Sequence, residues 1–123
     1  MYGFDKLNQN SDAPLYVTEG WFDAYVVDGV AVFGNDLSKG QEYWLTRSNR
    51  RKVVIPDKHP TGFKLASKGI ELGWEVATPD IGDCDDINSA VATYGKLYVL
   101  NSLRENTHSG TTALMLSELY CNE

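Results

Sequence analysis

Three acidic positions in this chain each follow a short run of apolar, β-favouring residues. Glu19 comes directly after the segment PLYVT, residues 14–18, and Asp57 comes after the segment VVIP, residues 53–56. The third position is an acidic loop, residues 80–86, which follows the segment WEVAT and ends at Asp86. Carboxylates gathered at one point repel each other unless a cation neutralises them, and such hard oxygen ligands favour Mg²⁺ or Mn²⁺. The residue types alone allow two interpretations, a divalent-metal site or solvated acidic residues in turns.

The segments around these acids alternate between strand-like and helix-like patterns. Strands are expected at residues 14–18, 30–33, 53–55, 74–78 and 96–103, and helices at 22–28, 38–49, 61–72, 87–94 and 112–120. This alternation predicts a single compact α/β domain of the Rossmann-like kind. It should have about four to five mostly parallel strands and helices on both faces. Ligands of such sheets bind at the carboxyl ends of the strands, so the three acidic positions are expected to converge at one edge.

Two helix starts and one loop have signals of their own. Ser38 with Gln41 three positions later has the spacing of a capping box, and Asp85 or Asp86 is expected to cap the helix that follows the acidic loop. The segment 104–110 is polar and is expected to be a mobile loop.

Composition limits the kinds of partner and compartment. With 123 residues and 42% hydrophobic content, the chain is long enough for one core and too short for two ordinary domains. The formal net charge of −6 means that any contact with a nucleic-acid backbone must be local or mediated by metal. The two cysteines, Cys84 and Cys121, form no metal-ligand or disulfide pattern, and no run of eighteen apolar residues occurs. We therefore expect a cytoplasmic location and no membrane contact.

Three motifs occur in a fixed order. The segment YVTEGWFDA contains Glu19 and Asp23 in the pattern EGxxDA, and the segment VVIPDKHPTG contains Asp57 and Gly62 in the pattern DxDxxG, with His59 at the second acidic position. The segment DDINSAVATYGKL is similar to KDxNDAxxxYG, and its matching residues are Asp86, Asn88, Ala90 and Gly95. With these motifs, the chain from Tyr2 to about Leu103 resembles the Toprim domains of phage and bacterial-type DNA primases.

The resemblance implies roles for particular residues. Glu19 and Asp57 would be catalytic, and Glu19, Asp57, His59 and Asp86 would hold Mg²⁺ or Mn²⁺. An imidazole in place of a carboxylate at position 59 would weaken Mg²⁺ and favour Mn²⁺, although His59 also fits a solvent-facing loop residue. Asp23 and Asn88 would position the metal ligands without binding the ion themselves. Asp23 also fits a surface carboxylate in the first turn of a helix.

The basic residues have two interpretations. Arg50, Arg51, Lys52 and Lys58 are expected to contact a nucleic-acid backbone. The cluster that ends at Lys52 also fits the ordinary decoration of a helix C-terminus, and Lys58 also fits an exposed lysine.

The expected organisation and function follow the resemblance. Residues 1–13 would lead into a Toprim-like domain at 14–103, and residues 104–123 would form a loop and a C-terminal helix that packs on it. The domain would take part in RNA primer synthesis from nucleoside triphosphates on a single-stranded DNA template. A helicase or other primase subunits would be further partners, in the cytoplasm of the host if the chain is phage-encoded. Two alternatives are a stand-alone metal-dependent Toprim nuclease and an interaction module whose metal site has degenerated, as His59 hints.

Overall fold

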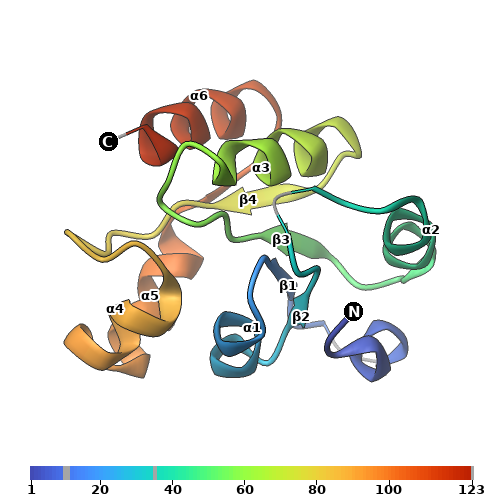
Figure 1. Ribbon diagram of the computed structural model, residues 1–123, viewed down its shortest axis with the longest axis horizontal. Helices are drawn as coiled ribbons and strands as arrows, with labels where there is room; N and C mark the ends of the chain where they lie inside the picture. The colour runs from blue at the N-terminus through green and yellow to red at the C-terminus, as the bar shows by residue number, and fades with distance from the viewer. Residues whose placement is uncertain (10–11, 35, 123) are drawn as a thin grey trace.

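The sheet has five strands, of which four are parallel. The computed structural model describes residues 1–9, 12–34 and 36–122 (Figure 1). The strands are β1 Leu15–Thr18, β2 Val30–Ala31, β3 Lys52–Val54, β4 Glu75–Ala77 and β5 Thr107–His108. Their order is β2-β1-β3-β4-β5, and only the pairing of β4 with β5 is antiparallel. The expected mostly parallel α/β sheet is therefore confirmed.

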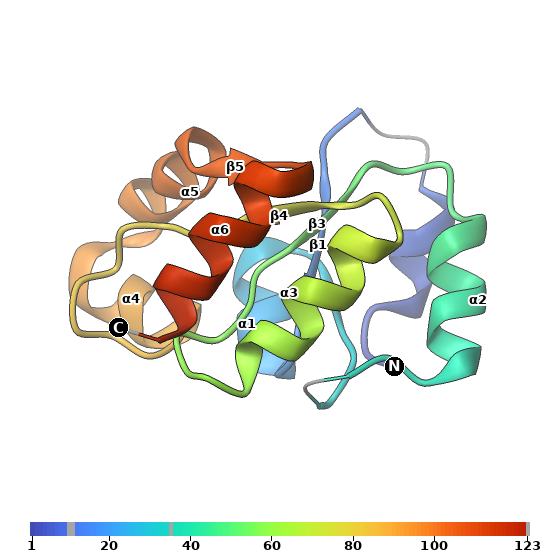
Figure 2. The ribbon, with the colours of Figure 1, turned by 90° about the horizontal axis from the view of Figure 1, so that it is seen from above.

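Helices cover both faces of this sheet. They are the 3-10 helix η1 Phe4–Asn8 and the α-helices α1 Trp21–Val27, α2 Lys39–Arg47, α3 Gly62–Glu71, α4 Ile87–Tyr94, α5 Lys96–Glu105 and α6 Gly110–Cys121. The helices α3 and α6 lie side by side on one face, and α1, α4 and α5 lie on the other (Figures 1 and 2). This arrangement is what right-handed crossovers between parallel strands produce.

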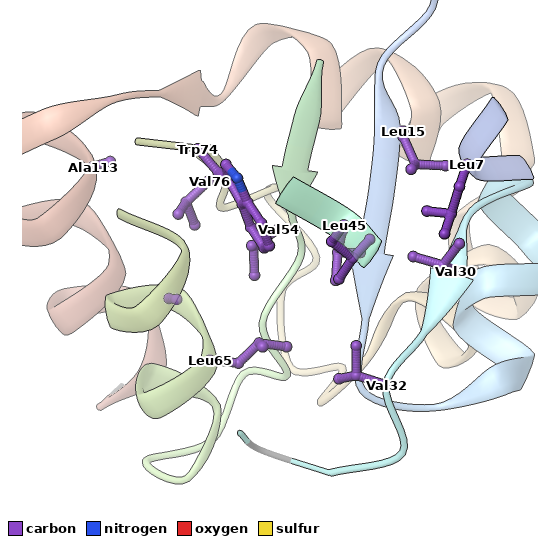
Figure 3. Packing of buried hydrophobic residues seen from close by; sticks show 12 residues of the cluster. Leu7, Leu15, Val30, Val32, Leu45, Val54, Leu65, Trp74, Val76 and Ala113 are labelled. Carbon is purple, nitrogen blue, oxygen red and sulfur yellow. The ribbon is translucent and has the colours of Figure 1, made fainter. Parts of the chain in front are cut away.

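Alternation along the strands builds two cores. In β3, Val54 packs into the cluster on the α3 side, whereas Val53 packs into the cluster on the α1 side. The first cluster also contains Leu45 of α2 and Leu65 of α3 (Figure 3). Because both faces are buried, the strands β1, β3 and β4 each lie in a short apolar run of the sequence.

The predicted capping signals are confirmed. The Ser38 hydroxyl accepts the Gln41 N–H at 3.1 Å, and the Gln41 side chain accepts the Ser38 N–H at 2.9 Å, which completes the capping box at the start of α2. Asp86 is the N-cap of α4, and its carboxylate accepts the Ser89 N–H at 2.8 Å. The acidic loop therefore ends where the sequence indicates.

The strand expected at residues 96–103 is wrong. This segment is α5, whose buried residues Val99, Ser102 and Leu103 recur at helical spacing. Gly95 has a φ of 91°, which ends α4 and turns the chain directly into a second helix. The fifth strand is β5 instead, and it lies inside segment 104–110, which was expected to be a loop.

The two ends of the chain are tied to the sheet. Tyr2 exchanges two backbone hydrogen bonds with Ala31, at 3.1 and 3.0 Å, and Leu7 is buried in the first core. The leading segment 1–13 includes residues 10–11, which lie outside the described residues. At the other end, α5 continues past residue 103, and α6 packs against β4 and β5. None of the described helices is long and apolar enough to cross a membrane.

Candidate functional site

Glu19 and Asp57 meet at the carboxyl edge of the sheet. They follow β1 and β3, which are neighbouring parallel strands with Val17 opposite Val54. The Glu19 carboxylate accepts the backbone N–H of Asp57 at 3.3 Å, and the two carboxyl groups share a hydrogen bond. The convergence of these two residues at one edge is therefore present, and it results directly from the strand order.

The Asp57 carboxyl holds its proton unusually firmly. Burial, the hydrogen bond that the protonated Asp57 carboxyl donates to Glu19, and the negative charges of Glu19 and Asp86 raise the pKa of Asp57 to about 8. At neutral pH the Asp57 carboxyl is therefore mostly protonated. Loss of that proton leaves two charges side by side, which is an arrangement that a cation relieves.

Asp23 and Asp86 lie close to this pair. Burial is the largest cause that raises the pKa of Asp23 to about 6, and the negative charges of Asp86 and Asp57 add to it. Asp23 is only 6% exposed, and its carboxylate accepts the Asn88 N–H at 2.8 Å. Asp23 therefore connects α1 to the first turn of α4, and the surface interpretation of this residue is wrong. Asn88 contributes its backbone amide.

Removing the Asp23 carboxyl should weaken the fold. At pH 5, where Asp23 is mostly protonated, Asp23→Ala leaves the Asn88 N–H without its acceptor and should lower the free energy of unfolding by about 1–3 kcal/mol. Asp23→Asn retains an acceptor oxygen and should lower it by less than about 1 kcal/mol. Urea unfolding at pH 5 measures both. Equal losses in the two variants would mean that the hydrogen bond does not hold α4 in place.

His59 is near Asp57 but is turned toward its own loop. His59 follows Asp57 by two residues, and its backbone N–H donates to the Asp57 carbonyl at 2.8 Å. Its Nδ1 accepts the Thr61 N–H at 3.3 Å and lies 3.0 Å from the Thr61 hydroxyl, and the residue is exposed. Coordination of a metal through Nδ1 would break these contacts. His59 remains a predicted ligand at an exposed position.

The basic residues around β3 have partners within the protein. Arg50 is buried and donates to the carbonyls of Lys6, Ala13 and Pro14 at 3.0–3.3 Å. The Arg51 guanidinium forms a two-point salt bridge with the Glu75 carboxylate. These contacts tie the amino end of β3 to the segments before β1 and in β4, at the opposite end of the sheet from Asp57.

The two lysines also donate to backbone carbonyls. Lys52 donates to the Ser48 carbonyl at 2.8 Å, and burial lowers its pKa. Lys58 donates to the Gly82 carbonyl at 2.6 Å, and its own N–H binds the Asp85 carbonyl at 2.8 Å. Lys58 thus joins the loop after β3 to the acidic loop at the carboxyl edge. Of the four basic residues expected to contact nucleic acid, it is the one next to Asp57 in the chain.

One residue of the site was not anticipated from the sequence. The Cys121 thiol, in the last turn of α6, lies 3.6 Å from the Asp57 carbonyl and donates to it. Burial, reinforced by the charge of Glu19, raises the pKa of Cys121 to about 12, so the thiol stays neutral. Cys121 and Asp57 are 64 positions apart in the chain, so no local sequence pattern predicts their contact.

The carboxylate pair suits a hard cation. Within residues 1–9, 12–34 and 36–122, no three His, Cys, Asp or Glu side chains are already grouped as an ion's ligand set. Mg²⁺ is usually held by one or two protein carboxylates and completes its shell with water and substrate phosphates. Glu19 and Asp57 supply such a pair, and Asp86 is the third carboxylate near them.

No protein-family model and no curated protein matches this chain.

Proposed function

We propose that the chain is a Toprim-type domain that binds Mg²⁺ or Mn²⁺ and takes part in RNA primer synthesis. The observation that supports this most is the hydrogen-bonded pair of Glu19 and Asp57 at the carboxyl ends of two adjacent parallel strands. An α/β sheet binds its ligands at this edge. The order of the three motifs provides the second line of support, because the residues at this edge are the ones that the motifs contain.

The roles of the residues follow from their positions. Asp57 and Glu19 would hold the ion, with Asp86 as the nearest further carboxylate. A bound divalent ion supplies positive charge to the phosphate oxygens and lowers the pKa of the attacking hydroxyl. Glu19 would accept the proton of that hydroxyl, since it already binds the Asp57 amide and is held in place by it. Asp23 would hold the start of α4 in place through its hydrogen bond with Asn88. This contact would keep Asp86 close to Glu19 and Asp57.

A metal titration tests the site. Mg²⁺ and Mn²⁺ should raise the melting temperature of the chain with increasing concentration. The gain is about 2.7 kcal/mol when an ion is at about 100 times its Kd. Glu19→Gln should abolish this stabilisation, whereas Glu105→Gln, which removes the same charge from an exposed position, should retain it. His59→Asp should strengthen the response to Mg²⁺ relative to Mn²⁺, because a carboxylate replaces a nitrogen ligand.

The titration and an activity assay separate the functional alternatives. If neither ion shifts the melting temperature, the metal site is refuted and the interaction module is favoured. If the ions bind, single-stranded DNA with nucleoside triphosphates should yield short RNA products that depend on Glu19. Cleavage of labelled DNA or RNA in the absence of triphosphates would instead identify a nuclease and contradict the proposed primer synthesis.

A further inference from the structure

A concave site lies at the opposite end of the sheet from Glu19 and Asp57. It is a cavity of about 360 Å³, and its lining includes Pro14, Tyr16, Asp28, Arg51, Leu100 and Arg104. Pro14 and Arg51 directly precede β1 and β3, so the cavity opens at the amino ends of these strands. On the α1 and α5 face, Tyr16 and Leu100 pack against the second core and form its apolar wall.

The cavity gathers positive charge in an acidic protein. Three of the chain's four arginines line it, namely Arg50, Arg51 and Arg104, although the net charge of the chain is −6. The acids beside it are already paired, because Asp28 binds Lys6 at 2.6 Å and Glu75 binds Arg51. The hydrogen bonds described for Arg50 and Arg104 go to neutral oxygens, so the site keeps an excess of positive charge.

Two of the arginines that line the cavity come from different elements. Tyr16 lines the same cavity and is half-buried. Burial raises the pKa of Tyr16, and the charges of Arg51 and Arg104 lower it. Arg51 comes from the start of β3, and Arg104 comes from the last turn of α5. Arg104 is exposed, and its described hydrogen bond goes to the Asn101 side chain one turn earlier, at 2.7 Å. Its remaining donors can therefore turn to a ligand without breaking an ion pair.

We propose that this cavity, which Tyr16 also lines, binds a phosphate-bearing ligand through Arg51 and Arg104. A phosphate group presents several acceptor oxygens in different directions, and donors from two elements can meet them. Arg104 offers the donors that Asn101 does not use, whereas Arg51 keeps its two-point salt bridge with Glu75 and offers its remaining Nη1 donors. Arg50 is fixed by carbonyls in the wall and contributes its charge to the site. The sequence placed Arg50 and Arg51 among the phosphate-binding residues, and the fold adds Arg104, which is more than fifty positions away.

Calorimetry without divalent ions tests this site independently of the proposed metal chemistry. In EDTA at fixed ionic strength, inorganic tripolyphosphate should bind the whole chain, and Arg104→Gln should weaken binding by about tenfold or more. Arg47→Gln removes the same charge outside the cavity and should change the Kd by less than about twofold. Glu19→Gln should bind tripolyphosphate as the unsubstituted chain does, even if it abolishes the metal response.

Competition identifies the source of the phosphate. Displacement of tripolyphosphate by a twelve-residue oligothymidylate would indicate the backbone of a nucleic-acid strand, whereas displacement by ATP alone would indicate a free nucleotide. The proposal is overturned if tripolyphosphate does not bind. Equal weakening by Arg47→Gln and Arg104→Gln, or loss of binding in Glu19→Gln, would also overturn it, because the anion would then bind elsewhere.

Discussion

Gly62→Ala should destabilise the protein by about 3 kcal/mol or more and disrupt the Asp57 loop. A Cβ atom at position 62 would lie 2.3 Å from the Asp57 carbonyl oxygen and 3.0 Å from its nitrogen. Both are backbone atoms, so no side-chain rotation relieves the clash. The start of α3 would have to move away from Asp57, and the hydrogen bond between the Asp57 amide and Glu19 would be strained with it.

A matched glycine in another helix provides the control. At Gly40, near the start of α2, an added Cβ would meet nothing closer than the Ser38 hydroxyl at 4.0 Å. Gly40→Ala should therefore stabilise the chain by about 0.5–1 kcal/mol through the lower entropy of the unfolded state. Urea unfolding compares the two variants, and the Mg²⁺ titration shows whether Gly62→Ala also loses the metal response. A loss of only a few tenths of a kcal/mol in Gly62→Ala would refute the tight contact.

The parallel part of the sheet was predictable because its signals are local. Buried parallel strands are apolar on both faces, so β1, β3 and β4 appear as short apolar runs that end at turn residues. The segment 96–103 has the same composition and is a helix. An apolar run of this length does not distinguish a strand from a buried helix. Here the packing of Val99 and Leu103 in the second core favours the helix. The two residues of β5 are too few for any periodicity.

The candidate site also has features that local sequence predicts and features that it does not. The proximity of Glu19 and Asp57 follows from two strand ends in a parallel sheet, and the capping role of Asp86 follows from its position before a helix. The burial of Arg50 and the approach of Cys121 to Asp57 depend on contacts between residues 36 or more positions apart. No local pattern encodes such contacts. The charge of Arg50 suggested an exposed residue. Instead, its guanidinium donates to the backbone carbonyls of Lys6 and Ala13, which precede β1 in the chain.

Asp57→Asn should make the protein more stable at pH 9 by about 2 kcal/mol and leave its stability nearly unchanged at pH 4. The pKa of Asp57 is raised from 3.8 to about 8, so the folded state holds this proton more tightly than the unfolded state does. The resulting stability is fully present below about pH 4 and is lost as the pH rises to about 8. The expected gain is smaller than the full shift implies, because Asp57 is partly exposed and water reaches part of the site.

Asp57→Asn removes the carboxylate charge that lowers the stability of the protein at high pH. An asparagine amide can donate to the Glu19 carboxylate as the protonated Asp57 does, so the hydrogen bond is retained at every pH. Denaturant unfolding at pH 4 and pH 9 measures the effect, and Asp83→Asn, in an exposed part of the same acidic region, is the control for a change in net charge. The ion and the proton compete for the same two carboxylates, so Mg²⁺ at pH 9 should stabilise the unsubstituted chain. It should not stabilise Asp57→Asn, because that variant lacks one of the two carboxylates. If the two substitutions gave the same stability difference at pH 9, the gain would come from net charge alone, and the carboxylate pair would have no special repulsion for a metal to relieve.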